Sequence, residues 1–160
     1  MTQEDLKLAL DILEKSVDIT VATNRPDGWP QATTVSFVSD GLKLYFGTWS
    51  KSQKATNIAR DPRVSVTADA PYHTWDQIRS LSLAGEATIV TDPQELAHVS
   101  QLMMQRFGPE IAKQMSSVDM SEMAVIRITP KVLSILDYAK GFGHKTDVAV
   151  TPDEIAGQAA

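Results

Sequence analysis

The feature that most limits the fold of this chain is a series of short segments rich in β-branched residues, each bounded by turn-forming residues. Seven segments are typical of strands: 18–24, 31–38, 42–47, 63–68, 78–90, 123–129 and 132–138. The connections at 25–28 and 39–41 contain Pro or Gly, which supply the backbone angles of tight turns. Because connections this short join antiparallel neighbours, we expect the first three strands to form a meander of hairpins.

Helices are predicted around these strands. Apolar residues recur at helical spacing near the start, behind Thr2 and Asp5, which are spaced as a capping box: Leu6, Ala9, Leu10, Leu13 and Val17. The segment 48–60 fits a short helix capped by Ser50 and ended by Asp61-Pro62. A third helix is expected from Asp92-Pro93 through Phe107, and a shorter one after Pro109.

Several strands with peripheral helices in a chain of 160 residues favour a closed or nearly closed antiparallel barrel, since closure removes unpaired edges. Gly85 marks a bulge or bend in the long strand, and the last two strands are expected to meet at Pro130-Lys131. We expect one domain over residues 1–150 and a frayed tail over 151–160, where no pattern is visible. The fold class is therefore mainly β with peripheral helices.

Composition excludes several classes of protein. The chain has 15 Lys and Arg against 20 Asp and Glu, and this net charge of −5 disfavours a nucleic-acid partner. The lack of cysteine excludes disulfides, thiolate zinc sites and a cysteine nucleophile. The acidic start does not resemble a signal peptide, and no apolar run approaches membrane-spanning length. We expect a cytoplasmic protein without a membrane partner.

The common catalytic motifs are missing: there is no Walker A loop, no Gly-x-Gly-x-x-Gly, no Gly-x-Ser-x-Gly and no His-Glu-x-x-His. His73, His98 and His144 lie far apart in three different contexts, so no metal site is expected. No catalytic residue can be named from the sequence.

One cluster of polar residues is a candidate binding site. It lies where a strand ends and a helix is predicted to begin. It combines three hydroxyls and two ammonium groups within seven residues: Thr48, Ser50, Lys51, Ser52 and Lys54. Helix-start amides, hydroxyls and lysines are the groups that bind a phosphate monoester. The same pattern also fits a capped helix with lysines on its solvated face, and Trp49 beside it suits either a cofactor contact or core packing.

The order of several segments resembles the flavin-binding core of the pyridoxamine 5′-phosphate oxidase-like family over about residues 18–107. The residues that carry the resemblance are Gly28-Trp29-Pro30-Gln31, Leu44-Tyr45-Phe46-Gly47-Thr48, Ser52-Gln53-Lys54, Asn57, Asp61-Pro62-Arg63-Val64-Ser65-Val66 and Leu81-Ser82-Leu83-Ala84-Gly85-Glu86-Ala87.

The resemblance implies an antiparallel split β-barrel that binds flavin mononucleotide (FMN) between two identical subunits. It implies that the backbone of one strand lies along the flavin ring, that the next strand also contacts the cofactor, and that the cluster holds the phosphate. The residues it implicates are Thr33, Thr34, Val35 and Ser36 at the ring, Gly47 and Thr48 on the next strand, and Lys51, Ser52, Gln53 and Lys54 at the phosphate. Ser80, contributed by the partner subunit, and Tyr138 are expected to approach the same cofactor.

Departures from the family pattern limit what the resemblance implies. Thr33 and Gln53 stand where members that process the vitamin carry basic residues, and the C-terminal Arg-x-His arrangement is absent. The chain therefore lacks the residues that bind the phosphate of the vitamin substrate, but it keeps the cluster expected to bind the phosphate of the cofactor. The expectation is an FMN-binding oxidoreductase acting on another small substrate. The alternatives are a split barrel that binds deazaflavin or haem, and a flavin-binding module without enzymatic activity.

Overall fold

The computed structural model describes residues 1–115 and 117–156. Its strands are β1 (Asp18–Asn24), β2 (Pro30–Ser36), β3 (Val38–Asp40), β4 (Lys43–Trp49), β5 (Arg63–Asp69), β6 (Arg79–Ile89), β7 (Met123–Asp137) and β8 (Lys145–Ala149). Its α-helices are α1 (Gln3–Lys15), α2 (Gln53–Arg60), α3 (Pro93–Phe107), α4 (Glu110–Met115) and α5 (Pro152–Ala156). Single 3₁₀ turns are η1 (Trp75–Gln77), η2 (Met120–Glu122) and η3 (Tyr138–Lys140).

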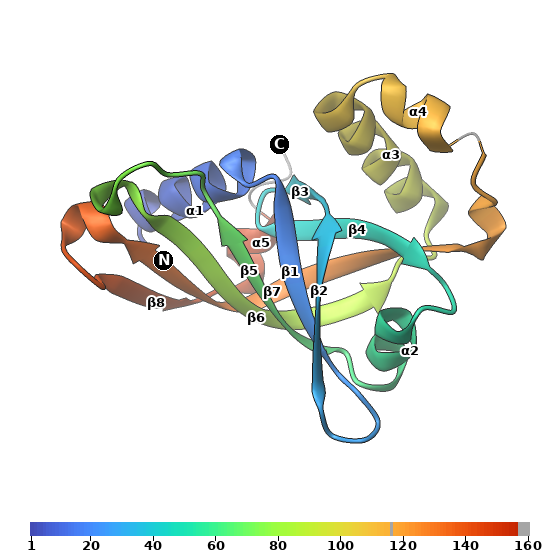
Figure 1. Cartoon of the computed structure of the whole chain (residues 1–160), viewed down its shortest axis with the longest axis horizontal. Helices are drawn as coiled ribbons and strands as arrows, with labels where there is room; N and C mark the ends of the chain where they lie inside the picture. Colours follow the sequence, from blue (N-terminus) through green and yellow to red (C-terminus); the bar gives the residue numbers. More distant parts are fainter. Residues whose placement is uncertain (116, 157–160) are drawn as a thin grey trace.

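The strands form one antiparallel sheet in the order β2-β1-β5-β6-β7-β4-β3, with β8 paired to β7 beyond this path. Figure 1 shows the sheet curled on itself, with the β1–β2 hairpin projecting from the body. β2 and β3 stand at opposite ends of the strand order, yet only Phe37 separates them in the chain. The segment 30–40 therefore connects the two edges of the sheet, which confirms the split-barrel fold.

The expected meander is only partly correct. β1 and β2 form a hairpin, and β3 and β4 form another around the predicted turn, pairing Val38 with Tyr45. The predicted strand 31–38 is instead two strands, because Phe37 turns into the core, where it is 0% exposed. The chain thus passes directly from β2, which pairs with β1, to β3, which pairs with β4 on the other side of the barrel.

The long strands β6 and β7 form the centre of the sheet. The register shifts between Ala84 and Gly85, which confirms the bulge predicted at Gly85. The two strands expected to meet at Pro130-Lys131 are one continuous strand, β7. Pro130 is accommodated because it lies opposite Gly85, beside this irregularity, where a missing amide donor disturbs the ladder little.

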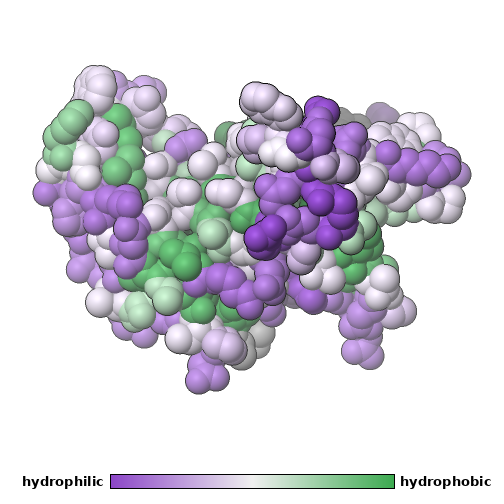
Figure 2. Space-filling view, turned by 90° about the horizontal axis from the view of Figure 1, so that it is seen from below, coloured by the Kyte–Doolittle hydropathy of each residue, from purple (hydrophilic) through white to green (hydrophobic). Residues whose placement is uncertain are grey.

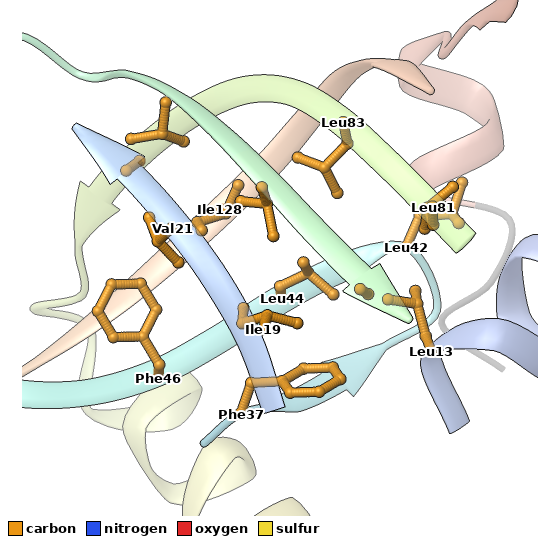
Figure 3. Packing of buried hydrophobic residues seen from close by; sticks show 14 of the residues in the cluster. Leu13, Ile19, Val21, Phe37, Leu42, Leu44, Phe46, Leu81, Leu83 and Ile128 are labelled. Atoms are coloured by element: carbon orange, nitrogen blue, oxygen red, sulfur yellow. The ribbon is translucent and has the colours of Figure 1, made fainter. Parts of the chain in front are cut away.

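The core fills the inside of the curled sheet. Side chains of alternate strand positions point inward and pack with the apolar face of α1, including Leu13, Ile19, Val21, Leu44 and Ile128. Figure 3 shows them converging from β1, β4, β6 and α1, with the ring of Phe46 beside Val21. A smaller cluster joins α3 to the outside of β3 and β4 around Val38, Tyr45 and Val99.

Three helix predictions are confirmed: the first helix with its Thr2–Asp5 capping box, α3 from Asp92-Pro93 to Phe107, and α4 after Pro109. Two details are wrong. The first helix ends at Lys15, so Val17 lies outside it and is exposed. The cap of α2 is Ser52 rather than Ser50, because Ser50 and Lys51 belong to a turn between β4 and the helix.

The C-terminal segment holds more structure than the sequence pattern indicated. β8 extends the sheet beside β7, and Val150 is buried. Residues 152–156, where fraying was expected, form α5, and Glu154 accepts hydrogen bonds from Thr151 and pairs with the Met1 ammonium at 2.9 Å. The part of the expected tail at 157–160 lies outside the described residues.

Candidate phosphate-binding site

A chain of polar contacts joins the end of β4 to the start of α2. Thr48 is buried, and its Oγ1 lies 3.0 Å from Ser52 Oγ, while Lys54 Nζ lies 3.4 Å from the same Thr48 oxygen. Ser52 Oγ also accepts from the Ala55 amide at 3.2 Å as the helix cap. The hydroxyls and the ammonium are therefore held together before any ligand binds.

Beside this chain lies a shallow hollow of about 290 Å³, lined by Trp49, Ser50, Lys51, Ser52 and Glu122. Trp49 is 50% exposed, so it faces the hollow rather than filling the core. Within the described part of the chain, neither Lys51 nor Lys54 belongs to an ion pair. The first-turn amides of α2 add donors, because a helix start leaves them without helical acceptors. The arrangement suits an anion.

Asn57 fixes α2 against the sheet. It is 0% exposed, and its Nδ2 donates to Thr23 Oγ1 at 2.9 Å on β1 and to Gln31 Oε1 at 3.2 Å on β2. Gln53 Nε2 donates to Asn57 Oδ1 at 2.8 Å. Gln53, expected at the phosphate, is thus used to hold the helix. Sequence reasoning noted Asn57 only within a motif, because the partners of a polar helix residue are decided by tertiary contacts.

The β2 residues expected at a cofactor ring point to two different faces. Thr33 and Val35 lie on the inner face, opposite Val21 and Ile19, and the buried Thr33 Oγ1 has no hydrogen-bond partner in the described structure. Thr34 and Ser36 lie on the outer face, and Ser36 Oγ donates to Asp18 at 2.9 Å. Their side chains alternate between the two faces, so only the backbone of β2 could present all four residues to one ring.

Ser80 and Tyr138 do not join the cluster within one chain. Thr48 pairs with Ala124 at one end of β7, whereas Ser80 pairs with Leu136 at the other. Twelve residues of β7 separate these two positions, which corresponds to about 40 Å of extended strand. The predicted site residues therefore fall into two groups at opposite ends of the sheet.

Tyr138 instead belongs to an aromatic group with Trp75 and Phe142. The ring of Tyr138 lies 6.4 Å from that of Trp75 and 5.2 Å from that of Phe142. Trp75 is 69% and Phe142 83% exposed. The main chain holds the two 3₁₀ turns together, since the Tyr138 amide donates to Ile78 O at 3.0 Å.

Among the described residues there is no group of three or more metal-ligating side chains. His98 lies 3.3 Å from Asp40, and His73 and His144 occupy exposed loops. No helix in the described part of the chain has the length and apolar character needed to cross a membrane.

The sequence matches the family model for pyridoxamine 5′-phosphate oxidase over residues 7–137. The chain belongs to this family. The match covers both the polar cluster at α2 and the beginning of the aromatic group, so the resemblance noted over 18–107 extends along almost the whole sheet. No curated protein sequence matches the chain.

Three solved structures show how varied the relatives are. A conserved hypothetical protein from Mycobacterium tuberculosis is 32% identical over 94% of this chain and 92% of its own, with a TM-score of 0.73. An F420 reductase is 30% identical over 78% of this chain and 94% of its own, with a TM-score of 0.62. A haem-binding protein from Mycobacterium smegmatis has a TM-score of 0.78 over 98% of this chain, at 21% identity. This chain spans 62% of that protein, and at this identity the likeness concerns the fold alone.

Proposed function

We propose that this protein is an oxidoreductase that binds a flavin-type cofactor, FMN or its deazaflavin counterpart F420, through the cofactor's phosphate. The observation that carries the proposal is the preformed contact of Thr48, Ser52 and Lys54 at the start of α2. Two lysines without an acidic partner and two oriented hydroxyls fit a phosphate, since charge-assisted hydrogen bonds are the strongest a protein offers an anion.

The choice between the two cofactors draws on different observations. FMN is favoured by the resemblance of the β4–α2 segment to flavin-binding members of the family. F420 is favoured by the reductase that is 30% identical to this chain. Haem ranks below both, because the observation that carries the proposal is a cluster suited to a phosphate and haem has no phosphate.

We further propose a homodimer with the cofactor at the subunit interface. Two rows of uncharged residues cross the outer face of β2, β1, β5, β6 and β7: Thr34, Thr20, Thr67, Ser82 and Ser134, and Ala32, Ala22, Ser65, Ala84 and Val132. All ten are exposed or half-buried. Viewed from below, a green, hydrophobic area is visible on this side of the molecule, with strongly hydrophilic residues next to it (Figure 2).

A second subunit packed on this face explains the two separated groups of site residues. If the two-fold axis runs across the strands, the Ser80 and Tyr138 end of one subunit meets the Lys54 end of its partner. Each site then combines a phosphate anchor from one chain with outer-face and aromatic residues from the other.

The flavin-type group, when bound, supplies hydride transfer, while the protein supplies binding and orientation. Lys54 and Lys51 would hold its phosphate, and the Thr48 and Ser52 hydroxyls would fix the direction in which the rest of the cofactor extends. The buried Asn57 contacts keep the helix start rigid against β1 and β2. Alignment is the main requirement for hydride transfer, so no general acid or base has to be assigned.

The vitamin phosphate itself is not the substrate that we propose. The lysines after Tyr138 are already paired, Lys140 with Glu4 at 2.7 Å and Lys145 with Asp147 at 2.9 Å. A second phosphate would have to displace these carboxylates. We therefore propose that the substrate is a small molecule other than the vitamin phosphate. A flavin-binding module without turnover remains the alternative, and it would bind the cofactor without supporting oxidation or reduction of any substrate.

The test is a fluorescence titration of the purified protein with FMN and F420, with haem followed by absorbance. We expect Lys54→Ala to weaken binding of the phosphorylated cofactor by about tenfold to a hundredfold, since it loses a charge-assisted hydrogen bond worth about 1.5 to 3 kcal/mol. Lys15→Ala is the control, because Lys15 is exposed on α1 and belongs to neither group of predicted site residues. Equal affinities of the two variants would contradict the anchor, and binding of haem alone would replace the proposal.

A further inference from the structure

Two features at opposite ends of β1 take no part in the candidate phosphate site. The hairpin of β1 and β2 projects from the body (Figure 1), and its turn carries Trp29, which is 73% exposed. At the other end of β1 lies a hollow of about 470 Å³, lined by Val17, Asp18, Asp69, Ala70, Pro71 and Tyr72. We propose that the hairpin tip of one subunit, with Trp29, docks in this hollow of a second copy of the chain. The inference rests on the dimer of the proposed function, although not on its cofactor.

The hairpin tip is held in one shape by its own contacts. Gly28 has a φ of 87°, and its amide donates to Arg25 O at 3.0 Å. The Arg25 amide donates to Trp29 O at 3.1 Å. The Asp27 carboxylate accepts from the Trp29 amide at 3.2 Å and pairs with the Arg25 guanidinium at 2.6 Å. Because Trp29 is presented on a preformed turn, its docking costs little conformational entropy.

The hollow combines exposed apolar surface with unneutralised negative charge. Val17 and Tyr72 are large, exposed side chains, and a tryptophan covering them would itself remove about 150 to 250 Å² from water. Asp18 and Asp69 stand at neighbouring ends of β1 and β5, and in the described part of the chain neither belongs to an ion pair. Like charges on adjacent strands repel each other. This end of the sheet therefore suits a partner that brings an apolar side chain and a positive charge.

The two-fold axis of the proposed dimer brings the tip and the hollow together. The two uncharged rows of the outer face cross β1 on either side of Val21, so an axis between the rows passes over Val21. This axis exchanges Asn24 with the partner's Asp18, because each lies three residues from Val21. The turn beyond Asn24 then reaches the partner's Val17 and the hollow beside it. Since the interface is isologous, the contact is made twice in each dimer.

The same axis matches opposite charges on β5. It passes over Val66 and exchanges Arg63 with the partner's Asp69, and both residues lie on the outer face of the strand. Arg63 is exposed, and Asp61 accepts from its Nε and Nη2, which leaves Nη1 for a second carboxylate. The positive charge that the hollow lacks is thus supplied by the partner's Arg63. This charge complementarity favours a second copy of the chain as the occupant.

The first test is the dimer dissociation constant, measured by analytical ultracentrifugation. We expect Trp29→Ala to raise it by at least about thirtyfold, as the loss of a tryptophan at the centre of a contact does, with an unchanged circular dichroism spectrum. Met104→Ala is the control, because Met104 is an exposed apolar residue on α3, and it should leave the constant unchanged. Asp69→Arg should weaken the dimer, and adding Arg63→Asp should restore part of the loss.

The second test uses the lack of native cysteine. Pro26→Cys on the hairpin tip is combined with Pro71→Cys at the hollow, and a short bismaleimide is added. The length of β1 separates the two positions within one chain, so a cross-link has to join two subunits. We expect covalent dimers from the double variant and from neither single variant. Gln101→Cys, exposed on α3, combined with Pro71→Cys is the control and should give none.

Each result decides the inference. A native dimer whose dissociation constant is unchanged by Trp29→Ala, or whose double variant gives no covalent dimer, would overturn it and leave the cofactor proposal standing. Cross-linking of Pro26→Cys alone would also overturn it, since the two tips would then meet each other. Failure of the proposed function looks different: a dimer with the expected cross-link that binds neither FMN nor F420. A native monomer would overturn both the proposed dimer and this contact.

Discussion

At the scale of single residues, the structure shows which partner each polar side chain contacts, whereas the sequence shows only that the side chain is polar or charged. Lys54 and Ser52 were expected at a phosphate, and they do contact Thr48. Gln53 was expected there too, and its side chain donates to Asn57. Gln53 and Lys54 are the first two residues of α2 and point about 100° apart, so their side chains reach different partners.

Gly85 is a residue whose role is visible both in the sequence and in the structure. A Cβ at this position would lie 2.6 Å from Thr129 O, a backbone atom that can move only with β7. We expect Gly85→Ala to destabilise the protein by about 1 to 3 kcal/mol, as overpacking of a tight contact does. Urea unfolding at one fixed protein concentration measures the change.

Gly47→Ala is the matched substitution, since it also lies in a strand and its added Cβ would meet Met123 Cε at 3.5 Å, an ordinary contact. Its stability should equal or slightly exceed that of the native protein. Equal losses in the two variants would show that the close approach at Gly85 is not what requires glycine.

At the scale of secondary structure, caps and turns were predicted best where the signal is local. The Thr2–Asp5 box and the Asp92-Pro93 start are both present as predicted. The cap of α2 was misplaced by two residues, because Ser50 and Ser52 are equally good caps by sequence and the chain direction after β4 decides between them. α5 was missed although its capping box is local: the Thr151 amide and hydroxyl donate to the Glu154 carboxylate, and the Glu154 amide donates to Thr151 Oγ1. Only the pairing of Glu154 with the Met1 ammonium depends on the tertiary structure.

The helix α5 should make stability depend on pH. Hydrogen bonds from the Thr151 amide, together with the Met1 ammonium, lower the pKa of Glu154 from 4.5 to about 2. A pKa that is lower in the folded than in the unfolded state contributes stability above about pH 4.5, and this contribution is lost as pH falls toward 2.

We therefore expect Glu154→Gln to be less stable than the native protein at pH 7, with the difference shrinking between pH 4.5 and pH 2. Urea unfolding across this range measures it. Asp153→Asn, on the exposed side of the same helix and without the Thr151 and Met1 contacts, serves as the control. A constant difference between Glu154→Gln and the native protein at all pH values would show that the carboxylate charge does not matter there.

At the scale of the whole molecule, the barrel leaves one sheet face uncovered and separates the predicted site residues by the length of β7. Both observations support the proposed dimer. Light scattering should then give twice the chain mass of 17.5 kDa. A stable cofactor-bound monomer would contradict the shared site.

Thr67→Arg places a large charge in the middle of the outer face without touching the core, because Thr67 is exposed on β5. We expect this variant to shift toward monomer and to bind the cofactor more weakly, while its circular dichroism spectrum is unchanged. Gln101→Arg, exposed on α3, is the control and should remain dimeric.

The sequence alone determined the strand-rich class, the first and third helices, the Gly85 bulge and the position of the polar cluster at residues 48–54, because each depends on residues close together in the chain. Only the tertiary structure decided that 30–40 connects the two sheet edges, that Asn57 holds α2, that Glu122 lines the hollow beside Ser52, and that Ser80 and Tyr138 lie far from Lys54. These facts depend on which distant strands become neighbours, and the free energy that selects this arrangement comes from packing of the shared core.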